Sequence, residues 1–349
     1  MAKKALTQKK PFYKRKAFLW PVGSVVGLIL IVALAFRISP WPGAMLIRSV
    51  FENSAEKVRV AMAKHQPAKP ITAITNQAYR PNDKDALLDV FYPEGTTAKL
   101  PVVIWTHGGA WISGSKDQDA PYFKLLAAEG YTVIAPNYSR GPEKQYPTAI
   151  YQLNDAYTYI MQNADRFHAD TNNIVFAGDS AGSQLSSQMA GMITNPAYAE
   201  FVGITPTLKP QQLKGVVLNC GIYNMLGLTE PDPTLPQIIG WGDDVSVWAY
   251  TGTKDFERSS AIKEMSSIKF VTSDFPATYI TGGNADPLTN GQSKPMSAKL
   301  KSLGVQVQEL YYPADHEPKL PHEYQFNLDN ADGQNAFKET VAFIKKHTE

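Results

Sequence analysis

Residues 173–193 read NIVFAGDSAGSQLSSQMAGMI, and this stretch decides the fold class. Its first five residues are rich in β-branched and aromatic side chains and predict a strand, whereas the last ten predict a helix. Between them, Gly178 and Gly182 flank a serine at a point where larger side chains would collide with neighbouring backbone. The pattern predicts a sharp strand-to-helix turn that presents Ser180 at the end of a strand.

Short apolar runs recur on both sides of this turn and are separated by stretches with helical spacing. The runs lie at 87–92, 101–105, 131–135, 216–220, 277–281 and 305–311, and the clearest helical stretches lie at 151–166, 293–303 and 334–346. Strands that alternate with helices are typical of an α/β protein. We therefore expect a mostly parallel central sheet flanked by helices.

The composition is that of one large folded unit. Of the 349 residues, 44% are hydrophobic and 19% are charged, which is ordinary for a globular protein with a substantial core. No repeat or low-complexity linker divides the chain, so we expect a single domain over 44–349. Two segments are expected to cap it: an amphipathic helical segment near 44–66 and a proline- and tryptophan-containing insertion near 226–274.

A second glycine motif, His107-Gly108-Gly109-Ala110-Trp111, directly follows the apolar run that ends at Trp105. A glycine pair after a strand can be a simple turn. It can also aim backbone N–H groups at a point where negative charge develops during a reaction. Because both glycine motifs follow predicted strands, in the order that an oxyanion loop and a nucleophile turn require, the sequence favours the second interpretation.

From about Leu88 to the C-terminus, the sequence resembles the hormone-sensitive-lipase-like esterases, a branch of the α/β-hydrolases. The resemblance rests on four motifs: HGGAW at 107–111, YSRGPE at 138–143 leading to Pro147, GDSAG at 178–182, and Asp286-Pro287-Leu288. It implies an α/β-hydrolase fold with a helical cap. It also implies a carboxylic ester hydrolase that forms a covalent acyl-enzyme on Ser180 and accepts short to medium acyl esters.

The same resemblance implies roles for the glycine loop. Backbone N–H groups of Gly108, Gly109 and Ala181 would form the oxyanion hole, and His107 would shape the loop rather than act as the base. The catalytic acid is best placed at Asp286, because it follows the predicted strand 277–281 and so lies at the sheet edge that carries the nucleophile. A carboxylate there can hold a histidine and stabilise the imidazolium.

Two histidines follow the last predicted strand and compete for the role of base. His316 is closer to the strand and stands 30 residues after Asp286, an interval typical of the family. His322 has an aromatic residue, Tyr324, two positions on, which is the usual family form, and it leaves a suitable gap before the final helix. We favour His322, with a proline-bounded insertion at 317–321 to reconcile the spacing, and keep His316 as the alternative.

Other functions fit parts of this pattern. A peptidase or amidase, or a deacetylase acting on polysaccharide, could use the same triad on the same fold, and a binding module could keep the fold without catalysis. The survival of Ser180, an aspartate and two histidines disfavours the last. No metal or organic cofactor is expected, because the sequence has neither a metal-ligand cluster nor a phosphate loop. Cys220 is the only cysteine, so no disulfide can form within the chain.

Residues 17–36 read AFLWPVGSVVGLILIVALAF and carry no charge. As a helix they would be about 30 Å long, the thickness of a bilayer's hydrocarbon core. Residues 1–16 hold seven of the 34 Lys and Arg and none of the 32 Asp and Glu. By the positive-inside rule we expect a basic cytoplasmic tail (1–16), a transmembrane anchor (17–36) and a catalytic domain outside the cytoplasm.

A cleaved signal peptide is the alternative, because Ala33-Leu34-Ala35 has the small-x-small form of a cleavage site. The protein would then be secreted. The apolar run is longer than the usual signal core, which favours the anchor. Beyond the tail the chain has 27 basic and 32 acidic residues without a basic stripe, so the expected partners are an ester substrate and the membrane, not nucleic acid. The oligomeric state stays open.

Overall fold

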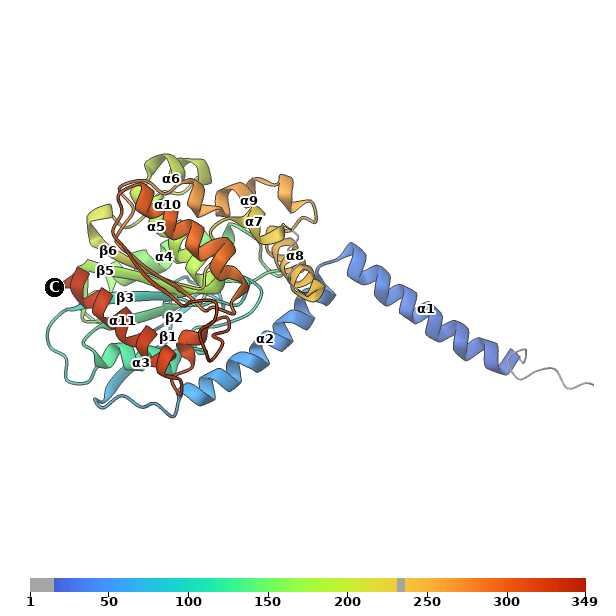
Figure 1. Ribbon diagram of the computed structural model, residues 1–349, viewed down its shortest axis with the longest axis horizontal. Helices are drawn as coiled ribbons and strands as arrows, with labels where there is room; N and C mark the ends of the chain where they lie inside the picture. The colour runs from blue at the N-terminus through green and yellow to red at the C-terminus, as the bar shows by residue number, and fades with distance from the viewer. Residues whose placement is uncertain (1–15, 231–235) are drawn as a thin grey trace, which may run out of the picture.

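The computed structural model describes residues 16–230 and 236–349. An eight-stranded sheet runs through its centre in the order β1-β2-β4-β3-β5-β6-β7-β8 (Figure 1). The strands are β1 (Ile71–Ala78), β2 (Leu87–Pro93), β3 (Leu100–Thr106), β4 (Thr132–Pro136), β5 (Ala169–Asp179), β6 (Leu213–Asn219), β7 (Thr278–Gly282) and β8 (Val307–Tyr311).

The sheet is mostly parallel, as predicted. Strand β2 pairs antiparallel with β1 and β4, and every other pair of neighbours is parallel. Strand β1 was not predicted. It lies at the edge of the sheet with only half-buried and exposed residues, so its sequence ITAITNQA lacks the continuous apolar run of the central strands.

Most helices of the described residues cover the two faces of the sheet or cap one end of it, and the first extends away from the domain. The helices are α1 (Lys16–Ile38), α2 (Trp41–Met62), α3 (Ala120–Ala128), α4 (Thr148–Gln162), α5 (Ser180–Thr194), α6 (Pro196–Val202), α7 (Met225–Thr229), α8 (Gln237–Thr251), α9 (Ser260–Met265), α10 (Lys294–Ser302) and α11 (Ala331–Thr348). Short 3-10 turns lie at Pro210–Gln212, Phe256–Arg258, Ser267–Lys269 and Tyr324–Phe326, and a π-helical turn lies at Thr289–Ser293.

Alternate residues of the central strands feed two separate cores. On β3, Ile104 belongs to the core beneath α4, α5 and α10, whereas Val103 and Trp105 belong to the core beneath α3 and α11. Figure 1 shows these two sets of helices on opposite sides of the sheet. A sheet buried on both faces needs strands that are apolar at nearly every position, which is why the central strands could be predicted from short apolar runs.

A smaller cluster joins the segments that were expected to cap the domain. Ala44 and Ile47 of α2 pack with Val245 and Ala249 of α8, and Ile112, just after the glycine loop, completes the cluster. The insertion near 226–274 contains α7, α8 and α9, with 231–235 outside the described residues. The two segments therefore meet directly over the loop that follows β3.

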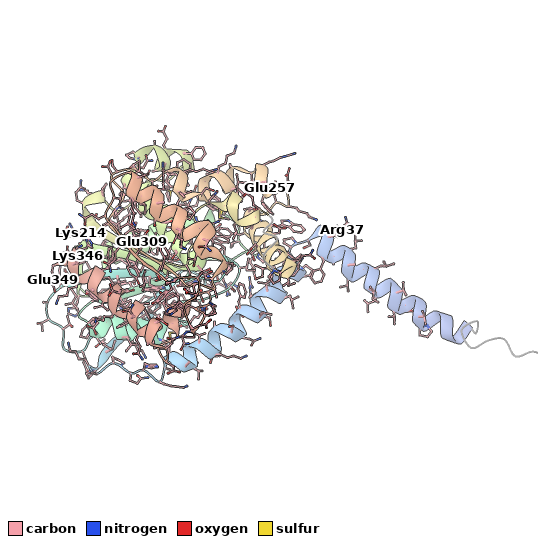
Figure 2. All side chains as sticks on the ribbon, viewed as in Figure 1. Arg37, Lys214, Glu257, Glu309, Lys346 and Glu349 are labelled. Carbon is pink, nitrogen blue, oxygen red and sulfur yellow. The ribbon has the colours of Figure 1, made fainter. Side chains whose placement is uncertain are left out.

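Helix α1 extends away from the rest of the protein (Figure 1). The window Pro21–Ile38 has a mean hydropathy of 2.2 and none of it is buried, so its apolar side chains stand in open space (Figure 2). By length and composition it could cross a membrane, as a signal sequence near an N-terminus also could. Of the predicted basic tail, all but Lys16 lies outside the described residues.

Candidate active site

Ser180 stands where β5 becomes α5, at a turn that only glycine neighbours allow. Strand β5 ends at Asp179 and α5 begins at Ser180, whose φ of +49° is unusual for a residue with a side chain. A Cβ on Gly178 would lie 2.6 Å from the carbonyl carbon of Gly182, and a Cβ on Gly182 would collide with the carbonyl oxygen of Thr106. The serine keeps 8% of its surface exposed.

The loop after β3 lies directly against this turn. Gly109 has a φ of +108°, and Ala110 and Trp111 follow with φ of +51° and +59°, so the chain here takes three successive left-handed residues. A Cβ on Gly108 would collide with the Asp179 carboxylate, and one on Gly109 would collide with the carbonyl of Ser113. The close contact between the loop and the turn is therefore possible only because Gly108 and Gly109 have no side chain.

His107 is held inside the loop. Its Nδ1 lies 2.8 Å from the Gly108 carbonyl oxygen, its ring stacks on Tyr138 at 4.3 Å, and its own carbonyl accepts a hydrogen bond from the Tyr138 hydroxyl. Burial lowers the pKa of His107 to about 4, so the ring is neutral near pH 7. A neutral, buried and stacked ring fits the predicted shaping of the loop.

Asp286 and His322 come together at the same edge of the sheet. Asp286 follows β7, its side chain is fully buried, and its Oδ1 lies 3.1 Å from Nδ1 of His322, whose side chain keeps 34% of its surface exposed. The backbone N–H of Leu288 also donates to this carboxylate. A buried acid beside the inner nitrogen leaves the outer nitrogen of the ring for chemistry.

The segment before His322 is hydrogen-bonded to the loop that carries Asp286. Leu320 is almost fully buried; its N–H donates to the Asn284 side chain at 2.8 Å, and its carbonyl accepts from Ala285 at 3.0 Å. A Cβ on Gly283 would collide with that carbonyl. These contacts fix the chain two residues before the histidine and so bring its ring to the acid.

His316 lies elsewhere. Its Nε2 is 3.0 Å from the Asp332 carboxylate at the start of α11, and its ring packs against Tyr312. The histidine beside Asp286 is thus His322, the favoured of the two candidates. His316 has the partners of a loop histidine that holds the end of the domain together.

Two effects act on the pKa of His322. Burial of the ring lowers it, but the neighbouring Cys220 and Asp286 side chains raise it well above its ordinary value. Burial also raises the pKa of Cys220 to about 11, so this thiol is neutral near pH 7 and the carboxylate supplies the charge. The Asp286 carboxylate therefore stabilises the imidazolium that forms when the neutral ring accepts a proton, which is what a histidine base requires of its acid partner.

Three more carboxyl groups gather behind the nucleophile turn. Asp179 accepts a hydrogen bond from Trp105 Nε1 at 2.8 Å, and Glu323, with a φ of +60°, places Oε1 3.8 Å from Nε2 of His322. Burial and then the charge of Glu323 raise the pKa of Asp179, and burial also raises that of Asp119. The raised pKa of Asp179 means that this buried side chain takes up a proton more readily than a free aspartate does.

A family model decides the chain's classification. The BD-FAE model matches residues 88–300, more than half of the chain and the part that carries β2 to α10. The chain belongs to the BD-FAE family.

Relatives of this BD-FAE chain include several esterases. An α/β hydrolase of Acanthamoeba polyphaga mimivirus is 32% identical over 46% of the chain and 48% of its own length. The esterase LipQ of Mycobacterium tuberculosis is 24% identical over 65% of the chain and 52% of its length. The versiconal hemiacetal acetate esterase of Dothistroma septosporum is 24% identical over 79% of this chain and 84% of its own length. The chain spans about half the length of the first two.

Solved structures confirm the predicted α/β-hydrolase fold. Esterase B from Lactobacillus rhamnosis superposes with a TM-score of 0.74 at 19% identity, covering 88% of this chain and 96% of that one. An esterase from Pyrobaculum calidifontis superposes with a TM-score of 0.66 at 23% identity, covering 92% and 97%. The resemblance to esterases of this fold, expected from the motifs, is confirmed as well.

Cys220, Asp286 and His322 also raise the question of a metal. Their ligand atoms lie within 4.8 Å of one another in the BD-FAE chain. The imidazole nitrogen and the carboxylate are paired at 3.1 Å, and burial raises the pKa of the neighbouring Cys220 thiol to about 11. The set fits an acid–base pair with a buried neighbouring thiol.

The carboxyl cluster was missed from the sequence. No role was predicted from the sequence for Asp119, Asp179 or Glu323. One signal was available: the residue before Ser180 and the residue after His322 are both acidic. If Ser180 and His322 are neighbours in the fold, Asp179 and Glu323 come close to each other as well. Close carboxyl groups raise each other's pKa and so favour a bound proton.

Asp179→Asn should stabilise the fold at alkaline pH. The pKa of Asp179 is raised in the folded state. Its contribution to the unfolding free energy is therefore fully present below the unfolded-state pKa of about 3.8 and is lost as the pH rises through the folded-state pKa. The asparagine side chain can still accept the hydrogen bond from Trp105. Its amide N–H can donate to Glu323 without any uptake of a proton from solution. We expect a gain of roughly 1–3 kcal/mol in unfolding free energy near pH 9 and a smaller or reversed difference near pH 4.

Urea denaturation of the detergent-solubilised chain at the two pH values measures this effect. Asp274→Asn is the matched control, because this aspartate is exposed and should leave the pH dependence unchanged. An Asp179→Asn variant whose stability relative to the parent does not change with pH would contradict the raised pKa of Asp179.

Proposed function

We propose that this protein is a carboxylic ester hydrolase in which Ser180 is the nucleophile, His322 the base and Asp286 the acid. The observation that carries the proposal is the 3.1 Å contact between His322 Nδ1 and the buried Asp286 carboxylate, at the sheet edge where Ser180 stands on its strained turn. The esterases among its relatives support an ester as the substrate.

The first half of the reaction forms an acyl-enzyme. His322 takes the proton of the Ser180 hydroxyl as the oxygen attacks the ester carbonyl. The carbonyl oxygen becomes an oxyanion and accepts hydrogen bonds from the backbone N–H groups of Gly108, Gly109 and Ala181, each contributing about 3 kcal/mol. The imidazolium then gives its proton to the alcohol oxygen, and the alcohol leaves.

Water completes the reaction. It attacks the acyl-enzyme as His322 takes its proton, the same N–H groups hold the second oxyanion, and the proton returns to Ser180 as the carboxylic acid leaves. Asp286 stays ionised and stabilises the imidazolium in both halves. The contact between the glycine loop and the nucleophile turn prepares the oxyanion site before substrate arrives, which avoids reorganisation during the reaction.

We also propose that α1 anchors the protein in a membrane. The support is its length, a mean hydropathy of 2.2 over Pro21–Ile38, the absence of any buried residue in that window and the basic residues that precede the helix. These residues place the N-terminus in the cytoplasm and the catalytic domain on the other side. Cleavage after Ala35 would instead release the same domain into the surroundings.

Ester preference distinguishes the proposal from its rivals on the same fold. We expect kcat/KM for nitrophenyl acetate and butyrate to exceed that for the nitroanilides of the same acids by at least about a thousandfold, because an esterase need not protonate an amine leaving group. Esters of graded chain length should be turned over best at short to medium lengths. Faster anilide than ester turnover would identify an amidase, and no turnover of either would indicate a binding module.

A further inference from the structure

The start of α2 is bound closely to the end of α1. Only Ser39 and Pro40 separate the two helices, a connection that spans about 10 Å at most. The Ser39 side chain accepts a hydrogen bond from the N–H of Trp41, and the Ser39 N–H donates to Ala35 of α1. Any membrane that holds α1 must therefore hold the first turn of α2 at its headgroup layer, which is several ångströms thick.

Exposed apolar side chains gather at this end of the domain. We call this set the junction surface: Trp41, Leu46 and Val50 of α2, and Ile238 and Ile239 of α8, which are between 36% and 66% exposed. The two helices cross here, because the Trp241 ring, one turn after Ile238, packs against Gly43. Tryptophan and aliphatic residues together are typical of surfaces that enter a membrane interface.

The α2 part of the junction surface is free of charge. The one charged residue in the first half of α2 is Arg48, and it turns inward to Glu143 and to the carbonyls of Ile112 and Gly141. The exposed charges of α2 begin at Glu52, farther from α1. The exposed side chains of α2 thus change from apolar to charged with increasing distance from α1. This order is expected for a helix that leads out of a bilayer.

Cationic groups flank the same place. Arg37 is exposed at the end of α1, where Figure 2 shows it beside the domain, and Lys254 donates to the Arg37 carbonyl at 3.1 Å. Side chains of this kind at the end of a membrane span reach the phosphate layer. An anchor helix, an uncharged apolar surface and flanking cations thus occur in one region.

The inner sides of these helices face the active site. Ala110 of the glycine loop packs against the cluster that joins α2 to α8. Burial and the charge of Asp244 raise the pKa of Asp243 on α8 to about 7, and the positive charge of His322 opposes this rise, so the α8 carboxyl lies within electrostatic reach of the ring. The elements that carry the junction surface therefore also cover the site.

We propose that the junction surface lies in the interface of the lipid bilayer that α1 spans, and that the active site takes esters which partition into that interface. This inference rests on the proposed ester hydrolysis and on the proposed anchor. It adds a substrate class, amphipathic esters with a short to medium acyl chain and a lipid-soluble alcohol, and it assigns one face of the catalytic domain to the membrane.

Fluorescent labels can locate the surface without any catalysis. In Leu46→Cys and Ile238→Cys, an environment-sensitive maleimide should label the new thiol, since Cys220 is buried. With the full chain in vesicles of phosphatidylcholine and phosphatidylglycerol, we expect a blue shift and quenching by bromine-labelled lipid at both sites. Phe201→Cys is the matched control, an exposed aromatic position on α6, and should show neither change.

Three results would overturn the proposal. Water-like emission at positions 46 and 238, in protein that floats with the vesicles, would show that the anchor holds but the surface stays in solution. Energy transfer between copies without lipid quenching would show that a second copy of the chain covers the surface instead. A chain that does not float with the vesicles would overturn the anchor and, with it, this inference.

A matched pair of substrates tests the substrate class. In the double variant Leu46→Glu/Ile238→Glu, turnover of a hexadecyl butyrate held in vesicles should fall at least about tenfold, because charge drives the surface out of the interface. Turnover of water-soluble nitrophenyl butyrate should not change, and Phe201→Glu should affect neither. An equal loss on both substrates would contradict delivery from the membrane, whereas inactivity of the unmodified protein on nitrophenyl butyrate would contradict the proposed function itself.

Discussion

Ser180→Ala should lower kcat by a factor on the order of 10⁵ to 10⁶, with the fold intact. Alanine cannot form the covalent acyl-enzyme, and what remains is the weak stabilisation that the glycine loop gives to direct attack by water. The substitution removes one oxygen at a position with a φ of +49°, so it adds no atom that could clash. Steady-state hydrolysis of nitrophenyl butyrate and labelling by a fluorophosphonate probe measure the loss.

Ser187→Ala is the matched control for the nucleophile. Ser187 lies on the same helix, is fully buried, and donates to the Gln184 carbonyl while it hydrogen-bonds with Ser267. Its loss should cost about 1 kcal/mol of stability but leave activity and probe labelling in place. Turnover or labelling that survives in Ser180→Ala would mean that another residue is the nucleophile.

His322→Ala should lower kcat by on the order of 10⁵, whereas His316→Ala should keep nearly all of it. Without the imidazole no group beside Asp286 can take the Ser180 proton, and the buried carboxylate loses the partner that holds its charge. His316 contacts Asp332 and Tyr312 instead, so its removal should cost some stability only. Single-turnover kinetics with nitrophenyl butyrate, next to thermal melts of both variants, separate the two effects.

The pair of histidine variants contains its own control, because both remove the same side chain from neighbouring positions of one loop. An inactive His316→Ala with an active, folded His322→Ala would reverse the assignment of the base. Loss of activity in both would indicate that the loop as a whole had moved, which a lower melting temperature of His316→Ala would reveal.

Much of the sheet could be predicted because its central strands are buried on both faces. Runs such as 101–105 and 174–177 are apolar at nearly every position, and the glycines at 178 and 182 signal the turn that follows one of them. Strand β1 could not be predicted, because an edge strand with few buried residues has no such run.

The site was less predictable where it depends on contacts distant in sequence. Spacing alone left His316 and His322 in competition, and the contacts that bring His322 to Asp286 are those of buried Leu320 with the Asp286 loop. The carboxyl cluster was missed for a related reason. A sequence shows that Asp119, Asp179 and Glu323 are acidic, but only the packing shows that Asp119 and Asp179 are buried and that Glu323 lies close enough to raise the pKa of both.

The two-residue connection between α1 and α2 has a kinetic consequence for the anchored chain. The connection is too short to let the catalytic domain move away from the membrane surface. Enzyme and substrate therefore meet by lateral diffusion in two dimensions. The rate of hydrolysis should then scale with the number of ester molecules per unit area of bilayer. Diluting a fixed amount of ester with inert lipid should slow the enzyme, even though the amount of ester in the sample is unchanged.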